Sequence, residues 1–572
     1  MKALTSAIAL SWGLLATSVL SAPLEDLVET LPLFGRPPTT MFSGYLDASE
    51  GCDLEANGPV CKIHYWLAMA ETEDPTNAPV VLWLNGGPGS TSIIGFLQEN
   101  GPLLMNATGG LMENPWSWTK LANFLVIEAP IGVGYSYCSR QMEGQPCQNT
   151  DKFTASASRA ALVDFFTHKF PELADNDFFI TGESYAGVYI PTLTKEILDH
   201  APEINMVGIA VGDPCTDNTA QADSMDSLWY GHKYGLVDDA TFDKLWNQCD
   251  LRFPTVMAQG GAHAAAAFWN QHLLKLPLDR RHKAIQERFL KTGHENPECL
   301  MAYRKYMISS SHGLSQGWRN LYIDDYSLFA PVTNQEDEDM QAYMRRRDVR
   351  KALHVEEAPT TEWPESGVGF DYTKEYDACN WDGDAIVGPS MIEFYRNIAP
   401  RLQTTLVYNG DTDPCVSYEG TRTAILRVGF AELDGGSYRP WFYNQSATTL
   451  QVLAEKAPLF GPDLMAQSVG AQFGGEVVNY EHGLSFLTVH GSGHMVPQFR
   501  PQAALHMLQK LLTGDDLAPL MPTNATLQQM SAAEFSESMN AWTELAMSAP
   551  YIYDSSALYR PVRSQEAMVQ VQ

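Results

Sequence analysis

The chain has 572 residues, of which 45% are hydrophobic and 18% are charged, a composition typical of a globular protein with a large core. Its formal net charge of −31 argues against nucleic-acid binding, because phosphate backbones attract clusters of Lys and Arg. The length allows either one large α/β domain with insertions or two to three smaller domains.

Residues 1–21 have the features of a secretory signal peptide. Lys2 precedes a mostly apolar stretch at residues 7–20, and Ser21 is a small residue at the expected cleavage position. This stretch is shorter than the ~20 residues of a spanning helix, and no later stretch reaches that length, so we expect no membrane anchor. Three N-x-S/T triplets agree with the secretory route, with acceptors Asn106, Asn444 and Asn524. We expect an extracellular, vacuolar or lysosomal protein.

Residues 22–212 alternate strand and helix patterns, which favours a mostly parallel α/β sheet. Alternating polar and apolar residues at 42–65 predict antiparallel strands. Continuous apolar runs predict buried strands at residues 80–84, 124–127, 178–180 and 206–211, and helical patterns occur at residues 157–169 and 188–199.

The pattern changes at residues 213–385, where strand-like runs are scarce. Helix-like stretches at 262–274, 284–290 and 340–354 predict a mainly helical cap inserted into the fold. Strands at 404–408 and 484–489 and a helix at 501–512 then complete the sheet domain within residues 386–514. Residues 515–572 form an extension without a strong pattern or an evident role.

The predicted strand at 178–180 leads into Gly-Glu-Ser-Tyr-Ala-Gly at residues 182–187. A strand, a sharp turn with serine at its tip and a helix make up a nucleophile elbow. The tight turn requires small residues two positions before and after Ser184, and Gly182 and Ala186 meet this requirement.

An acid and a base follow Ser184 in the order of the α/β-hydrolase fold. Asp413 and His494 each come shortly after a predicted strand, and parallel strands present such residues at their carboxyl edge. Because a serine hydroxyl is a weak nucleophile, His494 would take its proton and Asp413 would orient the imidazole. Asp411 is the alternative acid and His490 the alternative base.

An acyl intermediate also needs an oxyanion hole. The N–H of Tyr185 and that of Gly87, in a glycine-rich loop after the strand at 80–84, are the expected donors. This loop lacks the lysine of a phosphate-binding loop. No H-E-x-x-H motif and no zinc-type spacing of His and Cys occurs, so we expect neither a metal nor a cofactor.

Several sequence blocks resemble the serine carboxypeptidases, the family of carboxypeptidase Y and cathepsin A. They run in family order and occupy residues 83–89, 127–137, 182–187, 348–354, 409–413 and 493–497. The resemblance extends from about residue 40 to residue 512 and leaves the tail uncovered. It implies an α/β-hydrolase fold, the triad Ser184, Asp413 and His494, and the oxyanion-hole residues Gly87 and Tyr185.

The resemblance also implies that Asn85, Gly86, Glu99 and Glu183 hold the terminal carboxylate of a substrate, and that Met495 lines an apolar pocket for the leaving residue. Neighbouring carboxyls cannot all ionise, and a protonated glutamic acid can donate to the substrate carboxylate. The expected function is release of C-terminal residues from peptides and proteins at acidic pH. An acyltransferase or esterase on the same scaffold is the alternative, and a non-catalytic binding protein is more remote. The sequence does not indicate an oligomeric state.

Nine cysteines leave at least one outside disulfides. Short intervening loops favour Cys52–Cys61 and Cys138–Cys147, and Cys249–Cys299 would bridge the insertion. Two departures from the family pattern affect the rest: Ser90 stands where the family has a half-cystine, and Asp213 stands where it has asparagine. Our hypothesis is a Cys215–Cys415 bridge near the site, with Cys379–Cys415 as the alternative.

Overall fold

The computed structural model describes residues 22–106, 108–249, 296–310, 335–360, 362–364, 369–380, 388–445 and 468–549. The predicted signal peptide and the predicted helices at 262–274 and 284–290 lie outside these residues.

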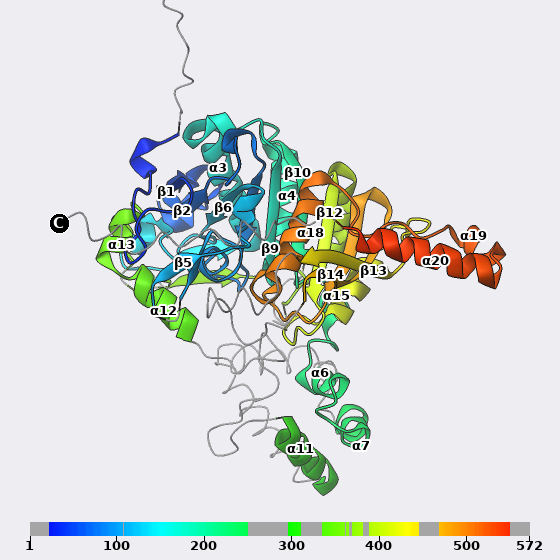
Figure 1. The fold of residues 1–572 in the computed structure, drawn as a ribbon. Helices are drawn as coiled ribbons and strands as arrows, with labels where there is room; N and C mark the ends of the chain where they lie inside the picture. Colours follow the sequence, from blue (N-terminus) through cyan, green and yellow to red (C-terminus); the bar gives the residue numbers. More distant parts are fainter. Residues whose placement is uncertain are drawn as a thin grey trace, which may run out of the picture.

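An 11-stranded mixed sheet forms the centre of the protein (Figure 1). Its order is β1-β2-β6-β3-β9-β10-β12-β15-β14-β13, with β7 beside β2. The neighbours from β6 to β15 pair in parallel, and the pairs at both ends are antiparallel. The strands are β1 (Met41–Asp47), β2 (Cys61–Ala68), β3 (Val80–Leu84), β6 (Asn123–Ile127), β7 (Tyr137–Cys138), β9 (Phe178–Glu183), β10 (Met206–Gly212), β12 (Thr404–Gly410), β13 (Arg439–Gln445), β14 (Gly470–Asn479) and β15 (Leu484–Val489).

The central strands are apolar throughout because both faces of the sheet are covered. In β3, Val80, Leu82 and Leu84 enter one hydrophobic core, whereas Val81 and Trp83 enter the other. This alternation follows from the period of two along a strand. The sequence therefore predicted the central strands, and the structure confirms each of them within a few residues.

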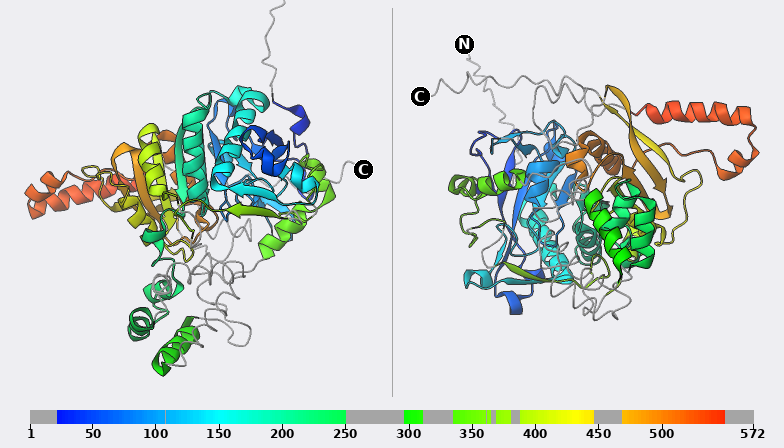
Figure 2. Two further views of the ribbon diagram at one scale, coloured as in Figure 1. Left: turned by 180° about the vertical axis from the view of Figure 1, so that it is seen from behind. Right: turned by 90° about the horizontal axis from the view of Figure 1, so that it is seen from below.

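Helices cover both faces of the sheet (Figures 1 and 2). The first core includes α3 (Asp151–Asp164), α4 (Ala186–His200) and α14 (Met391–Ile398). The second includes α18 (Pro501–Thr513), α12 (Gln335–Met344) and α13 (Arg347–Ala352). The remaining helices are α1 (Leu54–Asn57), α2 (Ser139–Met142), α5 (Asn218–Gln221), α6 (Ser227–Lys233), α7 (Asp239–Asp243), α11 (Pro297–Ser310), α15 (Tyr418–Leu426), α17 (Val496–Phe499), α19 (Asn524–Gln529) and α20 (Ala532–Met547). This is the α/β-hydrolase architecture.

The described part of the segment between β10 and β12 is mostly helical, as the sequence predicted. Helices α6, α7 and α11 lie together beyond one end of the sheet (Figure 1), around a small core that includes Leu228, Leu245 and Tyr303. One short strand, β11 (Phe370–Thr373), pairs in parallel with β8 (Cys147–Thr150). A second small sheet joins β4 (Leu103–Met105) and β5 (Leu111–Glu113).

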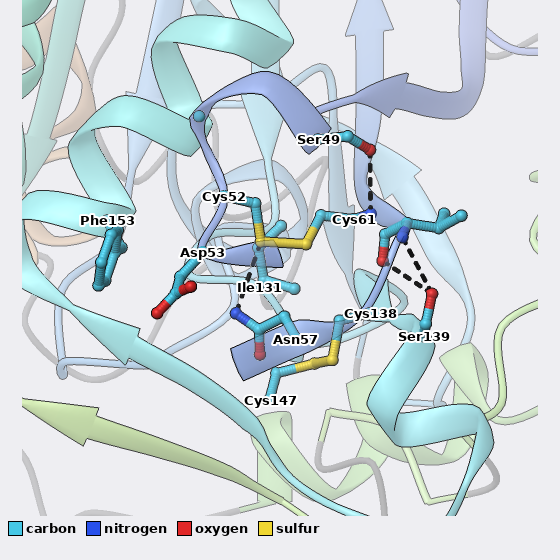
Figure 3. Close-up of a disulfide and its surroundings, with 12 residues drawn as sticks. Ser49, Cys52, Asp53, Asn57, Cys61, Ile131, Cys138, Ser139, Cys147 and Phe153 are labelled. Carbon is cyan, nitrogen blue, oxygen red and sulfur yellow. Dashed lines mark hydrogen bonds between the residues drawn. A yellow bond between two sulfur atoms is a disulfide. The ribbon is translucent and has the colours of Figure 1, made fainter. Parts of the chain in front are cut away.

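Four disulfides are present. The predicted pairs Cys52–Cys61, Cys138–Cys147 and Cys249–Cys299 are confirmed. The first two lie side by side because Cys61 and Cys138 are opposite each other in the β2–β7 pair (Figure 3).

The fourth bridge corrects our hypothesis for the remaining cysteines. Cys215 pairs with Cys379, 164 residues away, and their Cα atoms are 5.5 Å apart. Cys415 remains a thiol, so both Cys215–Cys415 and Cys379–Cys415 are wrong. The sequence could not reveal this pairing, because it depends on how the cap segment returns to the carboxyl edge of β10.

The C-terminal extension contains two helices that the sequence analysis missed. Helix α19 begins at the cap Thr523, and α20 begins with a reciprocal capping box between Ser531 and Glu534. Figures 1 and 2 show α20 extending away from the sheet beside β13. Within the described residues, no helix is long and apolar enough to span a membrane.

Candidate active site

The residues proposed for catalysis follow parallel strands of the same sheet. Ser184 comes directly after β9, Asp413 follows β12, and His494 follows β15. The loop with Gly86 and Gly87 follows β3, which is the neighbour of β9. Parallel strands end at the same edge of a sheet, so the topology brings all these segments to one place.

Ser184 has the strained backbone of a nucleophile elbow. Its φ of +66° lies in the left-handed region, which non-glycine residues rarely adopt. A Cβ on Gly182 would lie 2.1 Å from the carbonyl oxygen of Leu84, and a Cβ on Gly86 would lie 2.2 Å from the backbone nitrogen of Tyr185. Only glycine at both positions lets the strand, the elbow and the glycine-rich loop pack this closely.

His494 and Asp413 form a buried pair. The imidazole Nδ1 is 2.8 Å from Asp413 Oδ2, and both side chains are almost fully buried. The backbone N–H of Cys415 donates to Asp413 Oδ1 at 2.7 Å. The alternative pair, His490 and Asp411, is also hydrogen bonded at 2.8 Å, but the His490 side chain is half exposed. Of the two pairs, His494 and Asp413 are therefore the more deeply buried.

Tyr185 is held by contacts on both sides. Its hydroxyl donates to Asp151 at 2.9 Å, and its backbone nitrogen abuts the glycine-rich loop. Gly87 is exposed with a φ of +112°. Both predicted oxyanion donors thus lie on the loop and elbow that meet beside Ser184.

Two buried glutamates share one asparagine next to the nucleophile. Asn85 Nδ2 donates to Glu99 Oε1 at 3.0 Å and to Glu183 Oε1 at 3.1 Å. Asn85 Oδ1 accepts from the indole of Trp83 at 2.9 Å and from the N–H of Gly95 at 3.0 Å. These contacts fix the amide and orient both carboxyls. The roles of Trp83 and Gly95 could not be predicted from the sequence, because both residues lie in apolar stretches that carry no signal of a polar contact.

The electrostatics of the two glutamates favours a shared proton. Burial raises the pKa of Glu99 to about 7, and burial together with the charge of Glu99 raises the pKa of Glu183 well above its usual range. The second oxygens of both carboxyls are buried and receive no hydrogen bond from the described residues. A protonated carboxyl here can therefore donate to an incoming anion.

Met495 follows His494 directly and is partly buried. It is the N-cap of the short helix α17, so its placement depends on the same loop that carries the histidine.

A second serine–histidine–carboxylate chain is formed by residues of β1 and β2 and by Glu128, which follows β6. His64 Nδ1 is 2.8 Å from Glu128 Oε2, and His64 Nε2 is 3.0 Å from Ser43 Oγ. All three side chains are buried, and the Ser43 hydroxyl donates to the carbonyl of Leu353 at 2.7 Å. Glu128 also accepts from Thr91 and from the indole of Trp363. This chain joins the sheet to the cap segment through Leu353 and Trp363. Its serine is fully buried and therefore inaccessible to substrate.

Comparisons with known proteins agree with this geometry. A family model described as serine carboxypeptidase matches residues 32–514. Serine carboxypeptidase-like 34 of Arabidopsis thaliana is 29% identical over 524 residues, which cover 89% of this chain and 93% of the relative. The lysosomal protective protein of Mus musculus is 28% identical over 549 residues, which cover 88% of this chain and 97% of the relative.

The fold is also found among solved structures. A prohormone-processing carboxypeptidase from Saccharomyces cerevisiae matches with a TM-score of 0.55 at 19% sequence identity, and the match covers 83% of this chain and 91% of that chain. The family model spans the elbow, the histidine–aspartate pair and the buried glutamates. The chain therefore belongs to the serine carboxypeptidase family.

Proposed function

We propose that this serine carboxypeptidase removes C-terminal residues at acidic pH, with Ser184, His494 and Asp413 as its catalytic triad. The observation that carries the proposal is the position of the buried pair Glu99 and Glu183 immediately beside the nucleophile. A general esterase has no need for buried acids at this place. A chain-end peptidase needs a group that recognises a carboxylate.

In the first half of the reaction, Ser184 Oγ attacks the carbonyl carbon of the last peptide bond while His494 takes the hydroxyl proton. Asp413 stabilises the imidazolium. The backbone N–H groups of Tyr185 and Gly87 stabilise the oxyanion. His494 then gives its proton to the leaving amine, the C–N bond breaks, and the C-terminal residue departs.

In the second half, water attacks the acyl group on Ser184 while His494 again removes a proton. The new acid is released and the Ser184 hydroxyl is restored. If an alcohol took the place of water, the product would be an ester, which is the acyltransferase alternative.

Substrate recognition depends on the protonation of the glutamate pair. Glu183 or Glu99 donates a hydrogen bond to the terminal carboxylate, and Gly86 offers its N–H from the adjacent loop. Asn85 holds both carboxyls in position. Once both glutamates ionise, they repel the substrate's carboxylate, so binding weakens as pH rises. Met495 would contact the side chain of the leaving residue and favour apolar residues there.

The proposal extends to the secretory route. The four disulfides fit an oxidising compartment; an extracellular, vacuolar or lysosomal location remains our prediction. Of the three predicted glycosylation sites, Asn524 is exposed, whereas Asn106 and Asn444 are partly buried. The Asn444 amide donates to the carbonyls of Met547 and Ala549, so Asn524 is the best placed acceptor.

The function is tested with blocked dipeptides that carry either a free or an amidated C-terminus. We expect rapid turnover of the free acid only, strongest at acidic pH, and loss of at least about 10³-fold in kcat for Ser184→Ala. Ser43→Ala is the matched control, because that serine also contacts a histidine but is fully buried within β1. Equal turnover of the amide, or persistent activity in Ser184→Ala, would contradict the proposal.

A further inference from the structure

Asp213 is attached to the loop that carries Asp413. It follows β10 directly, and its backbone N–H donates to the carbonyl of Tyr408 at 2.8 Å. Its Oδ1 accepts from the Asn409 side chain at 3.0 Å and from the Gly410 N–H at 2.9 Å. These three bonds hold the Asp213 carboxyl against the end of β12.

The Asp213 carboxyl lies close to two residues of the proposed triad. Oδ2 is fully buried and receives no hydrogen bond from the described residues. One carboxylate oxygen each of Asp213 and Asp413 and one ring nitrogen of His494 all lie within 4.8 Å of one another. Two ionised carboxylates at this separation in a buried site would repel each other strongly.

The ionisable groups around Asp213 favour its protonated form. Burial and the charge of Asp413 raise the pKa of Asp213 well above its usual range, and Glu183 on β9 acts in the same direction. Tyr408 on β12 also faces this group. Asp413 instead receives the N–H of Cys415 and contacts His494, and both contacts favour a carboxylate.

We propose that Asp213 is a neutral acid whose Oδ2 hydroxyl donates to the Asp413 carboxylate, and that it extends the triad into a chain of four: Ser184, His494, Asp413 and Asp213. Asp213 is a positioning residue, because it acts through Asp413 and does not touch the substrate.

This arrangement has a consequence for work at acidic pH. A donor on Asp413 stabilises its carboxylate form, and it draws negative charge away from His494. An ionised Asp413 keeps the imidazole orientated for its role as the base. The fourth residue therefore extends activity toward acid. The inference rests on the proposed function, but the protonation of Asp213 can be measured separately.

The first test measures that protonation by infrared spectroscopy of the resting enzyme at neutral pH. The spectrum of Asp213→Asn should lack one carboxylic-acid band that is present in the wild type, and the difference spectrum should show this loss. Asp411→Asn is the matched control. Asp411 lies on the loop of Asp413, accepts from the Gly491 N–H and pairs with His490. The Asp411→Asn spectrum should therefore keep every carboxylic-acid band of the wild type. Absence of the band change in Asp213→Asn would overturn the proposal.

The second test follows kcat/KM against pH. Asparagine keeps the acceptor for Asn409 and Gly410 and offers an N–H to Asp413, so Asp213→Asn should retain kcat/KM within about threefold and keep the acid limb in place. Asp213→Ala removes the donor, and kcat should fall about tenfold or more with KM little changed. Its acid limb should move up by about one pH unit.

The outcomes are distinct. An acid limb that moves equally in Asp213→Asn and Asp213→Ala would overturn the role of the donated hydrogen bond. If Asp213→Ala does not fold, the infrared band and the kcat/KM profile of Asp213→Asn against pH still test the proposal. Loss of the band in a protein without peptidase activity would confirm the neutral acid and reject the function instead.

Discussion

At the scale of single residues, Glu183 has the most direct link to specificity. It is the last residue of β9 and directly precedes Ser184, so the elbow that presents the nucleophile also places the acid. Asn85 donates to it and to Glu99. The same few atoms therefore combine a general acyl-transfer centre with a group that reads a chain end.

Replacing Glu183 with glutamine should flatten the pH dependence of substrate binding. In the wild type, the protonated Glu183 carboxyl donates strongly at low pH, and this donor is lost only as pH rises through the raised pKa of Glu183 itself. A glutamine amide is a weaker donor at every pH. We expect KM of Glu183→Gln to rise about three- to tenfold at acidic pH and to approach the wild-type value as the wild-type Glu183 ionises.

The control is Glu476→Gln on β14, because burial also raises the pKa of Glu476 but β14 carries none of the proposed site residues. Its KM profile should match that of the wild type. A Glu183→Gln profile parallel to the wild-type profile would refute the shared-proton argument.

At the scale of secondary-structure elements, the Cys215–Cys379 bridge connects the end of β10 to the cap segment. It closes a loop of 164 residues, whereas Cys52–Cys61 closes one of only 9. Asp213 lies two residues before Cys215, so the bridge also anchors the loop that supports the triad.

Removal of the long-range bridge should destabilise the protein more than removal of a local one. Loop-closure entropy gives about 5 kcal/mol for the Cys215→Ser, Cys379→Ser double variant and about 3 kcal/mol for Cys52→Ser, Cys61→Ser. The free energy of unfolding from denaturant titration, fitted for the sheet domain, compares the two. Equal losses would show that native-state contacts rather than chain entropy determine the contribution of the bridge.

At the scale of the whole molecule, stability and activity share a dependence on pH. Glu99, Glu183 and Asp213 all have raised pKa values because they are buried. The folded state therefore holds these protons more tightly than the unfolded state. Their stabilising contribution is complete below the ordinary pKa of each group, 4.5 for glutamate and 3.8 for aspartate. It is lost as pH rises through the raised values, about 7 for Glu99 and higher than usual for the others. The net charge of −31 adds self-repulsion in the same direction.

We expect Tm to fall by several degrees from about pH 5 to about pH 8. The Tm of the Glu99→Gln variant should fall less over this range, because the variant lacks one of the buried titrating carboxyls. Glu113→Gln removes the same formal charge from an exposed position and should keep the wild-type slope. Thermal unfolding measured across this pH range would contradict the argument if Glu99→Gln and Glu113→Gln had the same slope.

The sequence by itself determined the central strands, the elbow and the order of Ser184, Asp413 and His494. Each of these depends on local patterns: apolar runs, small residues around a turn, and polar residues that follow a strand. The antiparallel pair β13 and β14 and the helices of the extension were missed, since their patterns are weak and their register depends on the neighbouring strand β15.

Only the tertiary structure decided which distant residues meet. It paired Cys215 with Cys379 and brought Asp213 against Asp413. Asp213 in the sequence is only an acid after a strand. Its protonation depends on burial and on a neighbouring carboxylate 200 residues away, and these arise only when parallel strands align their ends.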